Sequence, residues 1–287
     1  MKIMTTGLSV TAFLAASIAA VAGTSEHAEV ADAVIDAQRA VLAEATEDAG
    51  FGPQSPRDLR YTVGGNPRVF SMAPPASQMN LCNIHFHDGA EHAGGQFSTF
   101  RGNGDGEGWG TGYVYDGDLT EAELAPLAAP IGTGEHGLLQ SGQTIEVHFV
   151  HTTSDIEPGP TLGACLADST GNPQLRVETQ VMVLVNDANA IDFRTLADVQ
   201  QVNGYWQAPN VPENTGTPIA YLGSTTGPSY NEKASPFQVT WSVRPEVIKV
   251  DINTVGAWYA DNMFDEDHAH GVRNLVTNVD LLSPINQ

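Results

Sequence analysis

The sequence predicts a mostly β domain of the α+β class, with an N-terminal helix and few other helices. Three observations favour this class: short β-prone runs recur along most of the chain, turn-forming residues separate them, and one stretch shows clear helical spacing. No linker is long enough to divide the runs, so we expect a single domain. The expected strands are Leu81–His87, Thr144–Thr152, Arg176–Val185, Phe237–Val243 and Val247–Ile252.

The first 22 residues have the pattern of a secretory signal peptide. Lys2 precedes an apolar run from Leu8 to Val21, and small residues end at Ala22. No later run approaches the roughly 18 apolar residues that suggest a membrane span. We therefore expect cleavage after Ala22 and a soluble domain over residues 23–287. It would be periplasmic or secreted, with no membrane association after cleavage.

Helical spacing marks residues 28–47, and Gly50 and Gly52 follow as stop signals. This predicts a packed N-terminal helix. Its expected apolar stripe consists of Val30, Val34, Ile35, Val41 and Leu42.

A glycine-rich stretch, Gly102–Gly117, follows the first predicted strand. Asn103, Asp105 and Glu107 alternate with glycine there, which raises the possibility of calcium ligation. The stretch lacks the acidic spacing and terminal glutamate of an EF-hand loop. We therefore expect an irregular surface loop.

The net charge is −22, from 12 basic and 34 acidic residues, and the only lysines after Ala22 are Lys233 and Lys249. Such a chain is a poor partner for nucleic acid or anionic membranes. The charge favours solubility instead.

Only two cysteines occur, Cys82 and Cys165. Export makes a disulfide between them the expected state, because exporting compartments oxidise free thiols. Metal ligation by either thiol is the alternative.

Three histidines on two predicted strands carry the main functional signal. Side chains alternate faces along a strand, so Asn83, His85 and His87 share one face. Glu146 and His148 share a face of the second strand in the same way. Histidines two apart lie about 6.5 to 7 Å apart at Cα, and a paired strand lies about 4.8 Å away. The three imidazoles can therefore meet at one ion.

Three neutral imidazoles leave a fourth tetrahedral position open, and zinc in such a site lowers the pKa of its bound water to about 7. Asn83 and Glu146 are candidates to accept the N–H of a ligand ring and fix its tautomer. A histidine pair on a strand is also common without a metal. His151 points to the opposite face from His148, and we interpret it as a buried structural histidine.

The order of these motifs resembles that of the alpha-class carbonic anhydrases, which carry Gln-x-His-x-His, Glu-His, Glu-x-His-x-Val-His, a Gly-Ser-x-Thr-Thr-Pro loop and Val-x-Trp. Gln54-Ser55-Pro56 also matches an N-terminal motif of that class. The spacings differ, since Gln54 and His85 are closer together, and Glu91 and His148 farther apart, than in the alpha class. The matching residues are Asn83-Ile84-His85-Phe86-His87, Glu91-His92, Glu146-Val147-His148-Phe149-Val150-His151, Gly223-Ser224-Thr225-Thr226-Gly227-Pro228 and Val239-Thr240-Trp241.

Three further pieces resemble the delta-class carbonic anhydrases more closely: Cys82–Gly95, Thr161–Cys165 and Asp265–Arg273. The resemblance extends over roughly residues 50–285. It implies one domain around a central, largely antiparallel twisted sheet like that of the alpha class. It also implies the reversible hydration of carbon dioxide to bicarbonate and a proton.

By resemblance, zinc is held by His85, His87 and His148, and zinc-bound hydroxide attacks carbon dioxide. Cobalt and cadmium are possible replacements. Glu91 would act with Thr226, or with Thr225 if the alignment shifts by one residue, to orient the hydroxide.

Other site residues follow from chemistry and resemblance together. Val150 and Trp241 are candidates for the apolar wall beside carbon dioxide, although core packing also explains them. Release of the proton calls for a histidine, and the candidates for this relay are His92, His268 and His270. The oligomeric state stays open.

Two other functions are weighed against this one. His85-x-His87-x-x-x-Glu91 fits the first metal motif of cupin oxygenases, but Met79 stands where cupins place a glycine, and their second motif is absent. A non-catalytic exported zinc-binding protein is the other alternative, and a saturated fourth ligand position would favour it.

Overall fold

We describe the protein from a computed structural model, over residues 29–45, 58–60, 71–134, 136–224 and 238–272. The predicted signal peptide, Gln54-Ser55-Pro56, Thr225 and Thr226 lie outside these residues. No helix of the described part is long and apolar enough to cross a bilayer.

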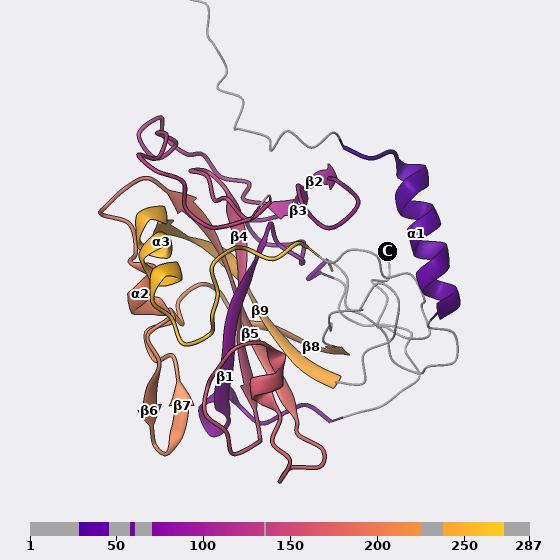
Figure 1. Cartoon of the computed structure of the whole chain (residues 1–287), viewed down its shortest axis with the longest axis vertical. Helices are drawn as coiled ribbons and strands as arrows, with labels where there is room; N and C mark the ends of the chain where they lie inside the picture. Colours follow the sequence, from indigo (N-terminus) through magenta and orange to yellow (C-terminus); the bar gives the residue numbers. More distant parts are fainter. Residues whose placement is uncertain (1–28, 46–57, 61–70, 135, 225–237, 273–287) are drawn as a thin grey trace, which may run out of the picture.

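A five-stranded sheet forms the centre of the fold, in the order β1-β4-β5-β9-β8 (Figure 1). Three of its four pairings are antiparallel, and β5 pairs with β9 in parallel. The predicted mostly β class with a largely antiparallel sheet is therefore confirmed. The strands are β1 (Asn80–Asp88), β4 (Thr144–Thr152), β5 (Leu175–Val185), β8 (Ile219–Ser224) and β9 (Gln238–Asp251).

Three of the five predicted strands match β1, β4 and β5, but the last two form one strand. Pro245 lies inside β9, where a missing N–H would normally end a ladder. The strand continues because its register against β5 shifts between Gln180 and Met182. The flanking Glu246 N–H donates to Thr215 O at 3.2 Å, outside the ladder.

Two short hairpins accompany the sheet. β2 (Thr99–Asn103) pairs with β3 (Thr111–Val114), so part of the glycine-rich stretch is an ordered hairpin rather than an irregular loop. A bridge between Ala90 and Tyr113 joins it to the end of β1. The second hairpin consists of β6 (Gln200–Val202) and β7 (Tyr205–Gln207).

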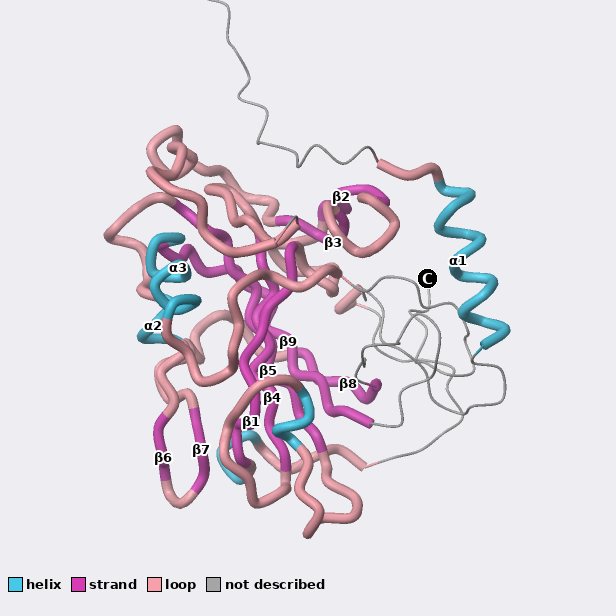
Figure 2. Tube along the Cα trace, viewed as in Figure 1, coloured by secondary structure: helices cyan, strands magenta, loops and turns pink. Residues whose placement is uncertain are grey.

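Helices α2 (Phe193–Leu196) and α3 (Ile252–Ala260) cover one face of the sheet (Figure 2). Phe86 on β1 is 1% exposed and lies 5.7 Å from the Phe193 ring and 5.5 Å from the Tyr259 ring. On the opposite face, Val177, Val239 and other apolar residues form a second buried cluster. Every residue of β4 is buried because the sheet is covered on both faces.

The N-terminal helix is α1 (Asp32–Ala45), which stands apart from the sheet beside the β2–β3 hairpin (Figure 1). Only part of its predicted stripe is packed. Ile35 is 3% exposed, whereas Val34 and Val41 are 43% and 64% exposed. The side chain of Leu42 lies outside the described residues.

Cys82 and Cys165 form a disulfide, as predicted, and metal ligation by these thiols is excluded because both sulfurs are bonded. The bond ties β1 to a 3-10 turn, η2 (Leu162–Cys165). A second 3-10 turn, η1 (Ala76–Gln78), precedes β1.

Candidate metal centre

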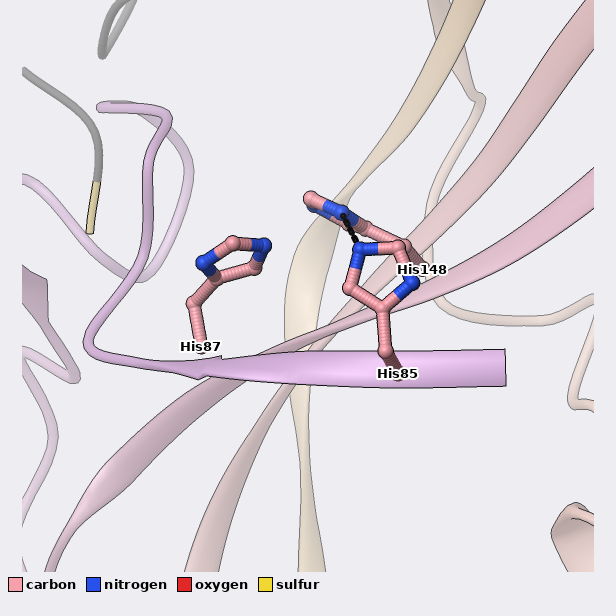
Figure 3. Close-up of side chains that lie close together, drawn as sticks. All are labelled: His85, His87 and His148. Atoms are coloured by element: carbon pink, nitrogen blue, oxygen red, sulfur yellow. Dashed lines mark hydrogen bonds between the residues drawn. The ribbon is translucent and has the colours of Figure 1, made fainter. Parts of the chain in front are cut away.

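The pairing of β1 with β4 places two of the three predicted histidines directly opposite each other. His85 is the cross-strand partner of His148, and His87 is that of Glu146. Ligand nitrogens of His85, His87 and His148 all lie within 4.8 Å of one another, and Figure 3 shows the three rings turned toward a common point. Strands separated by more than 50 residues thus bring the three side chains together.

In each of these rings, one nitrogen lies within hydrogen-bond distance of an oxygen that can act only as an acceptor. His85 Nδ1 lies 2.7 Å from Asn83 Oδ1, and the amide of Asn83 is oriented because its Nδ2 donates to Gly159 O at 3.1 Å. His87 Nδ1 lies 2.9 Å from Gly271 O, and His148 Nε2 lies 2.8 Å from Glu146 Oε1. These acceptors place the imidazole protons on those nitrogens.

The remaining nitrogens, Nε2 of His85 and His87 and Nδ1 of His148, therefore carry lone pairs. His85 Nε2 and His148 Nδ1 are 3.3 Å apart, where two acceptors repel rather than hydrogen-bond. Zn–N bonds of about 2.0 to 2.1 Å in a tetrahedron place two nitrogens about 3.3 to 3.4 Å apart. The donor set therefore fits a tetrahedral zinc ion.

Glu146 is the most connected side chain behind the centre. It is fully buried, and its Oε1 also lies 2.7 Å from His92 Nδ1, while His92 N donates to Oε2 at 3.2 Å. Burial raises the pKa of Glu146, but the charge of His92 and the hydrogen bonds from His148 and His92 outweigh it and hold the pKa well below its usual range. Glu146 is therefore a buried anion next to the rings.

His92 is 0% exposed and is held at both ring nitrogens. Its Nε2 lies 2.6 Å from the Tyr221 hydroxyl, on β8. The ring also lies 5.3 Å from that of Trp241. This placement makes His92 a partner of Glu146 and offers no support for the predicted proton relay through it. Tyr221 was not predicted, because nothing in its local sequence marks it as part of the site.

Glu91 is 2% exposed, and its Oε1 lies 3.6 Å from His87 Nδ1. Within the described residues its carboxylate shares a potential ligand group with Glu146 and His148, not with His85 and His87. The cupin-like combination of His85, His87 and Glu91 is therefore not among the described ligand groups. Thr225 and Thr226, the partners predicted for Glu91, lie outside the residues that the structure describes.

Of the two apolar candidates, Trp241 lies beside the rings and Val150 lies two residues after His148 on β4. Val150 is 2% exposed and Trp241 3% exposed, and both belong to the second buried cluster. The Trp241 ring is 5.0 Å from that of His148, and its indole Nε1 is buried without a hydrogen-bond partner.

His270 approaches the centre from the C-terminal segment. Its ring lies 5.7 Å from that of His85 and 6.0 Å from that of His87, and its Nε2 is 2.7 Å from Glu266 Oε2. The His268 ring lies 5.2 Å from that of His270, and the side chain of His268 is 41% exposed. The two rings therefore lie between the centre and the surface.

His151 is buried on β4, with its Nδ1 2.9 Å from Phe149 O. Burial lowers the pKa of its imidazole to about 4, against a smaller opposing effect of Glu178. The ring is therefore neutral at neutral pH.

Comparison with known proteins identifies one family. The sequence model described as delta carbonic anhydrase matches residues 76–254, more than half of the chain. A comparison with curated protein sequences finds no match.

Solved structures similar to this chain include three carbonic anhydrases. The alpha-carbonic anhydrase of Thermovibrio ammonificans, in complex with the inhibitor sulfanilamide, is 12% identical, with 80% of this chain and 85% of that chain covered and a TM-score of 0.29. The Photobacterium profundum alpha-carbonic anhydrase is 14% identical, with coverage of 88% and 97% and a TM-score of 0.29. A hyperthermostable carbonic anhydrase from an active hydrothermal vent chimney is 14% identical, with coverage of 78% and 84% and a TM-score of 0.27. Scores this low establish no shared detail of the site.

Proposed function

Because this chain belongs to the delta carbonic anhydrase family, and so is a metalloenzyme that hydrates carbon dioxide, we propose that its metal is zinc held by His85, His87 and His148. The 3.3 Å approach of His85 Nε2 and His148 Nδ1 carries this proposal, because the opposite nitrogen of each ring is already held by a protein acceptor. Zinc in a three-histidine site lowers the pKa of a coordinated water to about 7, which supplies the nucleophile. Cobalt and cadmium suit the same donors.

Asn83, Glu146 and the Gly271 carbonyl hold the three rings in the tautomers that coordination needs. Glu146 has the strongest effect, because an anion accepting from His148 increases the basicity of that ring. His92 and Tyr221 in turn keep the Glu146 carboxylate in place.

Glu91 acts, in this proposal, on a threonine hydroxyl that orients the nucleophile. Its burial beside His87 supports the role, because a buried carboxylate at this place can accept a hydrogen bond from a hydroxyl next to the ligand rings. Thr226 and Thr225 both remain candidates for that donor.

Val150 and Trp241 provide the apolar wall for carbon dioxide. The substrate is small and apolar, so contact with buried side chains beside His148 suits it better than hydrogen bonds do.

His270 and His268 form the proposed route for the proton. His270 lies beside the ligand rings, Glu266 orients it, and His268 is exposed. Imidazole is the side chain that most often relays protons at neutral pH.

We also place the enzyme in the periplasm or outside the cell. The disulfide supports this, because such bonds persist in oxidising compartments.

Stopped-flow hydration of carbon dioxide, combined with measurement of bound zinc, tests the proposed centre. His148→Ala should bring the rate to background and remove the zinc, whereas His151→Gln, on the same strand but the other face, should retain both. Equal background rates for the wild type and His148→Ala would contradict the enzymatic function. Stoichiometric zinc without any hydration would favour the non-catalytic alternative.

A further inference from the structure

The glycine-rich stretch contains a regular pattern that the metal centre does not use. Every second residue from Gly102 to Gly112 is glycine, and all six have positive φ, between 59° and 108°. Residues with side chains rarely adopt this conformation. The loop therefore has a backbone conformation that depends on glycine, and three of its carbonyls accept hydrogen bonds from other segments of the chain.

Helix α1 is attached to one side of this loop. Val30 N donates to Gly104 O at 2.9 Å, and Gln38 Nε2 donates to Gly106 O at 3.0 Å. Asn103 Nδ2 in return donates to Val30 O at 3.1 Å. Ile35 is buried and Val30 packs against it, and Val30 in turn approaches the loop, because a Cβ added at Gly106 would lie 3.2 Å from Val30 Cγ2. Several polar bonds and one apolar contact thus join the helix to the loop.

The segment His270–Val272, which follows α3, is attached to the same loop. Val272 N donates to Gly108 O at 2.7 Å, and Val272 is fully buried. The approach is close, because a Cβ added at Gly108 would lie 2.6 Å from Val272 O. The carbonyl of the preceding residue, Gly271, is the acceptor for His87 Nδ1.

The segment also pairs with β1. His270 N donates to Phe86 O at 2.8 Å, and Asp88 N donates to His270 O at 2.8 Å. The Gly271 carbonyl is therefore fixed between β1 on one side and the glycine-rich loop on the other.

We propose that α1 and the loop form a brace that holds the Gly271 carbonyl on the ring of His87, so that Ile35 and Gly108 are positioning residues for that ligand. The inference rests on the proposed metal site. The acceptor behind a ligand histidine sets its tautomer and ring orientation, and losing one typically weakens metal binding 10- to 100-fold. Helix α1 lies outside both the matched range 76–254 and the wider resemblance to the family, so family membership does not imply the brace.

A first test uses two glycines with similar backbone conformations. Gly108→Ala adds a methyl group against Val272 O, whereas Gly204→Ala, at φ +86°, adds one where nothing lies within 4 Å. Both substitutions strain the backbone, but only the first displaces the segment that carries Gly271. We expect the zinc dissociation constant, from competition with a chromophoric chelator, to rise about tenfold for Gly108→Ala and less than twofold for Gly204→Ala.

A second test releases the helix itself. Ile35→Asp places a charge at the buried position against which Val30 packs, whereas Val34→Asp places the same residue at a position that is 43% exposed. Helix propensity changes almost equally in the two variants. We expect zinc binding to weaken about tenfold only in Ile35→Asp, and Ile35→Val to restore it.

The visible spectrum of the cobalt-substituted protein separates positioning from general stability, because the bands report ligand geometry. Altered bands in Gly108→Ala and Ile35→Asp, but not in their controls, are expected. Wild-type affinity in both variants, or weaker binding with unchanged bands, would overturn the brace. His148→Ala distinguishes a failure of the metal site from a failure of the brace. If His148→Ala still binds zinc, the proposed site itself is wrong. If His148→Ala loses zinc but Ile35→Asp binds it as the wild type does, only the brace is refuted.

Discussion

His85 and His148 lie directly opposite each other on β1 and β4, with Nε2 of the first 3.3 Å from Nδ1 of the second. The two rings use different nitrogens because their proton acceptors differ in position. Asn83 precedes His85 on the same strand and holds Nδ1, whereas Glu146 holds Nε2 of His148. The local sequence around each histidine therefore selects the atom that faces the partner ring.

Removal of the negative charge behind His148 should weaken metal binding. Glu146→Gln keeps the shape of the side chain but replaces an anion that serves both His148 and His92. We expect the zinc dissociation constant to rise about 10- to 100-fold, as for other partners of ligand histidines. Chelator competition measures this. Glu178→Gln, on neighbouring β5, should bind zinc like the wild type, and equal affinity of the two variants would contradict the role of Glu146.

Lowering the pH from neutral toward 4 should destabilise the fold because of His151. Its folded-state pKa of about 4 lies below the unfolded value of about 6.5, so the folded state binds fewer protons between these values. The contribution is fully present above pH 6.5 and is lost as the pH falls toward 4, by roughly 3 kcal/mol at most. Urea unfolding of the wild type and His151→Gln across this window should show a shallower decline in the variant. Parallel curves would contradict the assignment.

Phe86 should be one of the most costly residues to truncate. It is 1% exposed between the sheet and the aromatic rings of Phe193 and Trp258. Phe86→Ala should lower the free energy of unfolding by about 3 to 5 kcal/mol, since it leaves a cavity in a packed core. Phe100→Ala provides the control at a side chain that is 49% exposed, and should cost far less. Denaturant unfolding curves compare the two.

Loss of the disulfide should destabilise the protein strongly. The bond joins Cys82 and Cys165, which are 83 residues apart, and closing a loop of that length stabilises by about 4 to 5 kcal/mol in the chain-entropy model. The double substitution of both cysteines by alanine should lower the urea midpoint accordingly. The reference is the wild type unfolded without reductant, so that its disulfide stays intact. A midpoint within error of the wild type would show that the bond contributes little.

Alternation along strands made the positions of the three histidines predictable. Asn83, His85 and His87 share a face whatever the strand pairs with, and the same holds for Glu146 and His148. The partner of His87 could not be found in this way. It is the backbone carbonyl of Gly271, 184 residues away, and a carbonyl leaves no signal in the residue type.

Tertiary packing overrode the local signals elsewhere. Two separate strands were expected before and after Pro245, yet β9 runs through this residue, where its register against β5 shifts. Helical spacing predicted a full apolar stripe on α1, but Ile35 is buried whereas Val34 and Val41 are exposed. The described contacts of this segment are largely hydrogen bonds to the glycine-rich loop. The sequence left several roles open for His92. The fold shows that Glu146 and Tyr221, the latter on β8, hold the two nitrogens of its ring.

The residue-for-residue pairing of Asn83–Asp88 on β1 with Ile145–Val150 on β4 also limits how this protein can change by insertion. One residue added between Asn83 and His85 would turn the downstream imidazoles toward the aromatic layer under α3 and bring Phe86 to the side of His148. Two added residues would restore the facing but move His85 away from its partner. Length variation should therefore accumulate in the connecting loops, while these two strands keep a fixed number of residues.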